Sequence, residues 1–143
     1  MPEVRLYIAT NYKSPAQRKG KTKYILEFIL PSGEPVTREE FIEHEGTLQE
    51  AVLDTILMAL KRLKKRVNIT IFLNKCAVLN AWQNGWVEMW RWNDYKSKKG
   101  TTIKDAEKYK QIVDNIVENG HQMRMEEGLG EYELYLKSEM EEK

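Results

Sequence analysis

An α/β fold built on a mixed sheet is the class that this sequence predicts, and three observations support it. Two apolar runs, residues 4–9 and 24–30, are separated by turn-forming residues and indicate neighbouring strands. A strongly apolar helical pattern then covers residues 48–63, and another apolar run, residues 67–73, follows it directly. A strand that follows a crossover helix lies parallel to its neighbour in the sheet. The sheet is therefore expected to contain both strand orientations.

The composition indicates one globular domain spanning residues 1–143. A charged fraction of 31% together with 4 Trp and 7 Tyr excludes a disordered chain. The single cysteine excludes a disulfide scaffold and a Cys-rich zinc site. No apolar run reaches the ~18 residues that span a bilayer, and Met1-Pro2-Glu3 does not begin a secretory signal. A soluble cytoplasmic protein without membrane association is expected.

The first three strands are expected to form a meander. The run at 4–9 is short and ends in a polar loop, whereas residues 24–30 are β-branched or aromatic at their centre. Residues 31–34 read Pro-Ser-Gly-Glu, which is turn chemistry. Residues 35–42 are therefore expected to return as a third, antiparallel strand.

Residues 48–63 are expected to form the central helix. Thr47 and Glu50 have the spacing of a capping box, in which each side chain accepts a hydrogen bond from the other residue's amide. Apolar residues recur at helical spacing over most of the circumference, which indicates a helix buried against the sheet. They are Val52, Leu53, Ile56, Leu57, Ala59, Leu60 and Leu63.

A tryptophan-rich segment follows the fourth strand. Residues 77–92 are expected to form one helix, with Trp82, Trp86 and Trp90 on a single stripe. That stripe favours burial against the central helix. Residues 93–100 are polar and basic and are expected to form a loop.

The last third of the chain contains a further helix and strand. Residues 103–119 are amphipathic and are closed by Gly120, which suits the position after a helix end. Residues 122–125 are expected to be the fifth strand. Residues 131–141 fit either a helix or a strand, because their apolar positions match both periods.

With this order of elements, the chain resembles the ribonuclease H family over nearly its whole length. Residues 47–63 are similar to the central helix of that family, including the pair Ala59-Leu60, and residues 73–78 resemble the junction between its fourth strand and next helix. Residues 82–99 resemble the region that carries a basic protrusion in some members, and residues 100–105 resemble the start of the following helix. The resemblance implies a five-stranded mixed sheet of order 3-2-1-4-5 flanked by helices.

The resemblance also implies where the chemistry of the family would lie. Its members hydrolyse the RNA strand of an RNA–DNA hybrid with two Mg²⁺ ions, which carboxylates must hold. Only the last carboxylate has a counterpart here, as Glu131 or Glu133. The sequence therefore predicts no metal or other cofactor and a chain that is not an enzyme. The matching positions without an acidic group are Ala9, Val52, Asn74 and, in place of the family's mobile histidine, Leu129.

The aromatic and basic residues after the tryptophan-rich segment are the best positive signal for function. Aromatic rings stack on bases or sugars, while neighbouring cations contact phosphates. The expected nucleic-acid-binding residues are Arg91, Trp92, Tyr95, Lys96, Lys98 and Lys99.

The remaining reactive side chains are expected to be structural. His44 and His121 lack companions at metal-ligand spacing. Cys76 lies at a helix start but has no partner base.

Three functions are compatible with these observations. The favoured one is a ribonuclease H-like module that binds an RNA–DNA hybrid or a duplex without cutting it. The alternative is a protein-interaction module of a mobile element or phage that inhibits a host nucleic-acid enzyme, in which the emptied metal site and the acidic segment 118–143 serve the partner. The third is a residual metal-dependent ribonuclease that uses Glu131 or Glu133.

Overall fold

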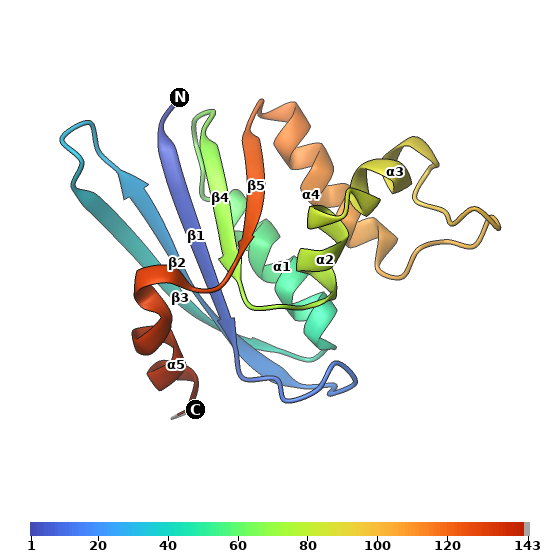
Figure 1. Ribbon diagram of the computed structural model, residues 1–143, viewed down its shortest axis with the longest axis horizontal. Helices are drawn as coiled ribbons and strands as arrows, with labels where there is room; N and C mark the ends of the chain where they lie inside the picture. Colours follow the sequence, from blue (N-terminus) through green and yellow to red (C-terminus); the bar gives the residue numbers. More distant parts are fainter. Residues whose placement is uncertain (142–143) are drawn as a thin grey trace.

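The sheet has five strands in the order β3-β2-β1-β4-β5, which confirms the predicted order (Figure 1). It is seen in a computed structural model that describes residues 1–141. β1 pairs antiparallel with β2 and β2 with β3, whereas β1 pairs parallel with β4 and β4 with β5. The strands are β1 (Glu3–Thr10), β2 (Gly20–Ile29), β3 (Pro35–His44), β4 (Asn68–Leu73) and β5 (Gln122–Glu127).

Helices cover the two faces of the sheet unequally (Figure 1). Four of them share one core with one face: α1 (Leu48–Leu60), α2 (Ala77–Gln83), α3 (Trp86–Trp92) and α4 (Ala106–Glu118). On the other face, α5 (Glu133–Glu141) follows the short 3-10 turn η1 (Gly130–Tyr132) and packs on β1 and β2. The larger core therefore lies on the α1 side, and a smaller one lies under α5.

The capping box of α1 is confirmed. The Thr47 hydroxyl accepts from the Glu50 amide at 3.3 Å, and the Glu50 carboxylate accepts from the Thr47 amide at 3.0 Å. These bonds satisfy backbone donors that a helix start leaves without partners. Glu50 is thereby committed to the helix end, and the hydrogen bonds that its carboxylate accepts from the amide and hydroxyl of Thr47 lower its pKa.

The expected single helix over residues 77–92 is wrong. The chain breaks at Gly85, whose φ of 73° lies in the left-handed region and cannot continue a right-handed helix. Trp82 and Trp90 still share one partner: both rings pack on Tyr109 of α4, with ring centroids 5.4 and 5.2 Å away. Trp86 leaves the expected stripe and is 43% exposed.

The ambiguous C-terminal segment forms a helix within the described residues. Leu136 and Met140, four residues apart, are buried against Tyr7 and Ala9 of β1. Leu134, which an alternating strand would place with Leu136, is 82% exposed. Residues 142–143, which end the chain, lie outside the described part.

Within residues 1–141 no helix is both long enough and apolar enough to cross a membrane. A cytoplasmic location stays a prediction. The single domain over residues 1–143 also stays a prediction.

Candidate functional site

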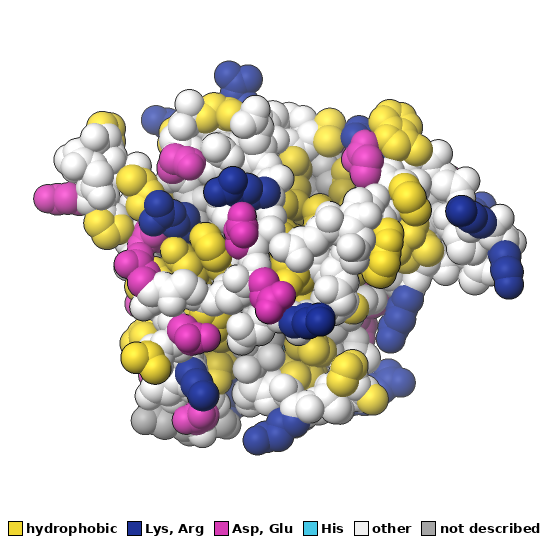
Figure 2. Space-filling model, viewed as in Figure 1, with side chains coloured by type: hydrophobic (Ala, Val, Ile, Leu, Met, Phe, Trp, Pro, Cys, Tyr) yellow, Lys and Arg dark blue, Asp and Glu magenta, His cyan; other side chains and the backbone are white. Residues whose placement is uncertain are grey.

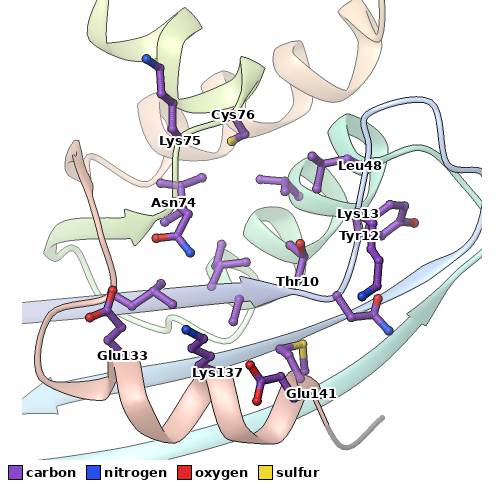
Figure 3. A pocket seen from close by; sticks show the side chains of 17 residues that line it. Thr10, Tyr12, Lys13, Leu48, Asn74, Lys75, Cys76, Glu133, Lys137 and Glu141 are labelled. Atoms are coloured by element: carbon purple, nitrogen blue, oxygen red, sulfur yellow. The ribbon is translucent and has the colours of Figure 1, made fainter.

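A cavity of about 720 Å³ opens at the carboxyl ends of β1 and β4 (Figure 3). Its walls come from the end of β1 and the loop after it, from the first turns of α1, from the end of β4 and from α5. Asn74 points into the cavity from the end of β4, and Lys137 points toward it from α5 (Figure 3). We call this cavity the strand-end pocket.

The strand-end pocket brings together the four positions that the family resemblance indicated. Ala9, Val52 and Leu129 contribute buried apolar surface, with exposed fractions of 5%, 2% and 3%, and Asn74 is exposed. Glu133 lines the pocket as well, whereas Glu131 is not among its lining residues.

Sequence reasoning missed four other charged residues of the pocket: Lys13, Lys75, Lys137 and Glu141. A helical assignment for α5 would have indicated two of them. Residues four apart lie on one side of a helix, so Glu133, Lys137 and Glu141 share a face. The ambiguity between strand and helix hid that spacing.

The pocket does not supply the ligands that two magnesium ions need. Mg²⁺ requires oxygen ligands in near-octahedral geometry, and the side chains of Ala9 and Val52 offer none. The carboxylates of the pocket are Glu133 and Glu141, with Lys137 between them on the same helix. Among residues 1–141, no three His, Cys, Asp or Glu side chains are grouped to hold a metal ion. The residues present therefore do not fit a two-magnesium centre.

A buried carboxylate of β2 holds the start of α5 over the sheet. Glu27 is 1% exposed, accepts from the Tyr132 hydroxyl at 2.5 Å and pairs with Arg5 at 3.4 Å. Burial and the hydrogen bond to Glu27 raise the pKa of Tyr132, so this hydroxyl stays protonated and donates.

A buried lysine of β2 holds the middle and end of α5. Lys23 pairs with Glu39 of β3 at 3.2 Å and with Glu139, and it donates to the Tyr135 hydroxyl at 3.2 Å. Burial alone would lower the pKa of Lys23, but these hydrogen bonds outweigh it and raise the pKa. The wall of the strand-end pocket that α5 forms is thus tied to two neighbouring strands.

The predicted nucleic-acid-binding residues lie on a protrusion formed by α3 and the loop after it (Figure 1). Trp92 is 74% exposed, and its indole nitrogen donates to Glu88 at 2.8 Å. The Arg91 guanidinium lies 5.1 Å from the centre of the Trp92 ring. These contacts orient an exposed aromatic ring beside a cation.

The loop after α3, residues 93–102, is named the basic loop. Its lysines Lys96, Lys98 and Lys99 are exposed, and Figure 2 shows basic side chains gathered along the protrusion. Backbone bonds close the loop on itself, with the Ser97 amide donating to Thr101 at 2.7 Å. The three ammonium groups are therefore carried on an ordered turn.

The structure corrects the role predicted for Tyr95. Its side chain is 7% exposed and belongs to the larger core, so it cannot stack on a base. Its φ of 56° turns the backbone inward, and burial raises the pKa of its hydroxyl. Tyr95 anchors the basic loop instead of contacting a ligand.

The histidines and the cysteine are structural within the described residues. His44 shares a hydrogen bond of 2.8 Å with Thr22, and His121 accepts from the Val67 amide at 3.1 Å. Burial lowers the pKa of both histidines. Cys76 begins α2, and burial raises the pKa of its thiol.

Comparisons with known proteins agree with this architecture. A "Ribonuclease H" of Thermoanaerobacter sp. (strain X514) is 24% identical over 81 residues, which are 57% of this chain and 51% of that protein. The chain thus spans about half the length of this curated relative. No protein-family model matches the chain.

Solved structures show the same fold at low sequence identity. LC9-RNase H1, described as a type 1 RNase H with the type 2 active-site motif, matches with a TM-score of 0.72 and 18% identity, over 96% of this chain and 69% of that one. The foamy viral protease-reverse transcriptase matches in two complexes. The dsDNA complex matches with a TM-score of 0.62 and 14% identity, over 98% of this chain and 89% of that one. The RNA/DNA hybrid complex matches with a TM-score of 0.60 and 18% identity, over 88% of this chain and 17% of that one.

The strand order and these solved structures show that the chain has a ribonuclease H-like fold. The chain is similar in sequence to proteins named ribonuclease H. They also contradict the prediction that the chain is not an enzyme, because the proteins that it matches carry the name of an enzyme.

Proposed function

We propose that this chain is a nucleic-acid-binding ribonuclease H-like domain whose ligand is an RNA–DNA hybrid or a DNA duplex. The observation that carries the proposal is the protrusion, where Trp92 and the lysines of the basic loop are exposed and held by local contacts. A viral protease-reverse transcriptase that contains a region of the same fold has been solved with dsDNA and with an RNA/DNA hybrid, which supports both ligands.

The charges around the strand-end pocket favour the same ligand. Lys13 flanks it from the loop after β1, and Lys75 flanks it from the link between β4 and α2. Along the chain, Lys75 and α2 connect the pocket to α3 and the basic loop. Lysine contacts to the phosphate backbone carry little sequence information.

Fluorescence anisotropy with labelled hybrid, duplex DNA and single-stranded DNA tests the proposal. We expect binding that weakens as salt is raised, because phosphate contacts release counterions. Trp92→Ala should weaken binding by about 1–3 kcal/mol, the usual contribution of one stacked base. The matched control is Trp86→Ala on the same helix, with melting temperatures measured for both variants. Absence of binding to all three ligands at low salt would refute the proposal.

Ribonuclease activity is the second candidate, and the names of the sequence relatives favour it. Incubation of a labelled hybrid with the protein, with and without divalent ions, tests it directly. Glu133→Gln changes the pocket carboxylate nearest the start of α5 and should reduce any cleavage that belongs to this pocket. Cleavage of equal rate in that variant would assign the activity to a contaminating nuclease.

A protein partner is the alternative kept from the sequence. In that case the domain belongs to a mobile element or phage and inhibits a host nucleic-acid enzyme. Co-purification of one stoichiometric protein after nuclease treatment would support it. A monodisperse domain that purifies without a partner protein and binds the hybrid would favour a nucleic-acid ligand instead.

A further inference from the structure

The face that α5 turns to the strand-end pocket carries three charged side chains in a row. Glu133, Lys137 and Glu141 are four residues apart, and all three line the pocket. Each residue turns a helix by ~100°, so this spacing keeps them on one side. Figure 3 shows Lys137 between the two glutamates, with its amine directed toward the strands.

Lys137 is free to bind a ligand. Among residues 1–141 its ammonium group takes part in no ion pair or hydrogen bond, although a carboxylate lies one helical turn away on each side. Lys23, the other lysine beside α5, is engaged by Glu39 and Glu139. Lys137 is therefore available at the pocket, whereas Lys23 is already paired within the fold.

The neutral polar groups of the pocket suit an anion as well. The Asn11 side-chain oxygen accepts from the Lys21 amide at 2.7 Å, which directs its NH₂ group away from that bond as a donor. Asn74 adds an exposed amide from the end of β4. Ammonium and amide donors bind phosphate oxygens, whereas a magnesium ion needs acceptor oxygens.

We propose that Lys137 binds a backbone phosphate of the nucleic acid directly, with the Asn11 and Asn74 amides as further donors, so that binding needs no divalent cation. This inference rests on the proposed function. The ammonium group supplies the positive charge that metal ions would otherwise bring to a phosphodiester at this place. Glu133 and Glu141 limit its strength, because each repels the phosphate.

Anisotropy titrations of labelled hybrid in EDTA and in excess Mg²⁺, at matched ionic strength, test the inference. The wild-type affinity should be equal in the two buffers. Lys137→Gln should weaken binding by about tenfold to a hundredfold in both, the range for loss of a hydrogen bond to a charged group, and should reduce the slope of log affinity against log salt by about one. Glu133→Gln should strengthen binding, because it removes a repelling charge.

Lys64→Gln is the matched control. It removes one exposed lysine beyond the other end of α1 and should leave the affinity unchanged. Binding by the wild type only in Mg²⁺, or an unchanged affinity of Lys137→Gln, would overturn the inference and leave the proposed function standing. Absence of binding in either buffer would overturn both. Lys137 is exposed, so the variant should keep the wild-type melting temperature.

Discussion

Removing the charge of the basic loop should change the salt dependence of binding by a calculable amount. Each phosphate that a cation neutralises on B-DNA contributes about 0.9 to the slope of log affinity against log salt. Three lysines of the loop are exposed, so their replacement should reduce the slope by about 2.7. Between about 50 and 200 mM salt, the wild type should then lose about 40-fold more affinity than the variant. The substitutions are Lys96→Ser, Lys98→Ser and Lys99→Ser.

Anisotropy titrations on duplex DNA at several salt concentrations measure these slopes. A control variant must change the net charge equally at another place. Parallel slopes for the wild type and the loop variant would refute the reasoning. Equal reductions in both variants would show an effect of net charge alone. The control substitutions, beyond the far end of α1, are Lys61→Ser, Lys64→Ser and Lys65→Ser.

Other predictions concern stability and reactivity. Tyr132→Phe removes the donor to buried Glu27, so the free energy of unfolding in urea should fall by about 1–3 kcal/mol. Burial holds the pKa of His44 and His121 below the unfolded value of 6.5, so the unfolded chain binds more protons as the pH falls below that value. Their contribution to stability should be complete above pH 6.5 and decline below it, and replacing both by Gln should reduce this decline in urea midpoints. Burial raises the pKa of Cys76, so at neutral pH iodoacetamide should modify the folded protein more slowly than the unfolded protein.

These measurements have internal controls. Tyr135→Phe removes a hydroxyl that donates to Glu39 at 2.7 Å and accepts from Lys23. Because Lys23 keeps Glu39 and Glu139 as partners, the loss should cost less than about 1 kcal/mol. Equal losses in the two tyrosine variants would contradict a special role for Glu27. An identical pH dependence of the wild type and the histidine variant, or equal alkylation rates in the folded and unfolded protein, would contradict the burial seen for those side chains.

The sheet was predictable because its signals are local and strong. Turn residues at 31–34 separate two apolar runs, and the spacing of Thr47 and Glu50 marks the start of α1 unambiguously. A buried helix followed at once by a strand leaves few topologies. Strand order therefore followed from short stretches of sequence.

The helix break at Gly85 was not predictable from periodicity. Tryptophans at four-residue intervals continue across the break, since two short helices can carry the same spacing as one long helix. Tyr95 was misjudged for a related reason. Its charged neighbours indicate an exposed loop, but the left-handed backbone at Tyr95 turns this one ring into the core.

The position of the strand-end pocket was predictable through the family resemblance, but its charge was not. Lys13, Asn74 and Lys137 come from three separate elements, and nothing local in the sequence links them. Lys137 could be placed only after α5 was known to be a helix. Side chains that converge from distant segments are the part of a site that single-sequence reasoning reaches last.

The two tryptophans that pack on Tyr109 support the short helices that carry the basic loop. Trp82 precedes the helix break at Gly85 and Trp90 follows it. The two short helices are therefore held together by packing on one aromatic ring instead of by a continuous helix. Tyr95 anchors the loop in the core, and residues 96–102 extend beyond that support. Insertions or deletions there would change the footprint of the domain along a duplex while the strand ends keep their positions. A longer or shorter basic loop would thus let the fold contact a different length of duplex without a change at the strand-end pocket.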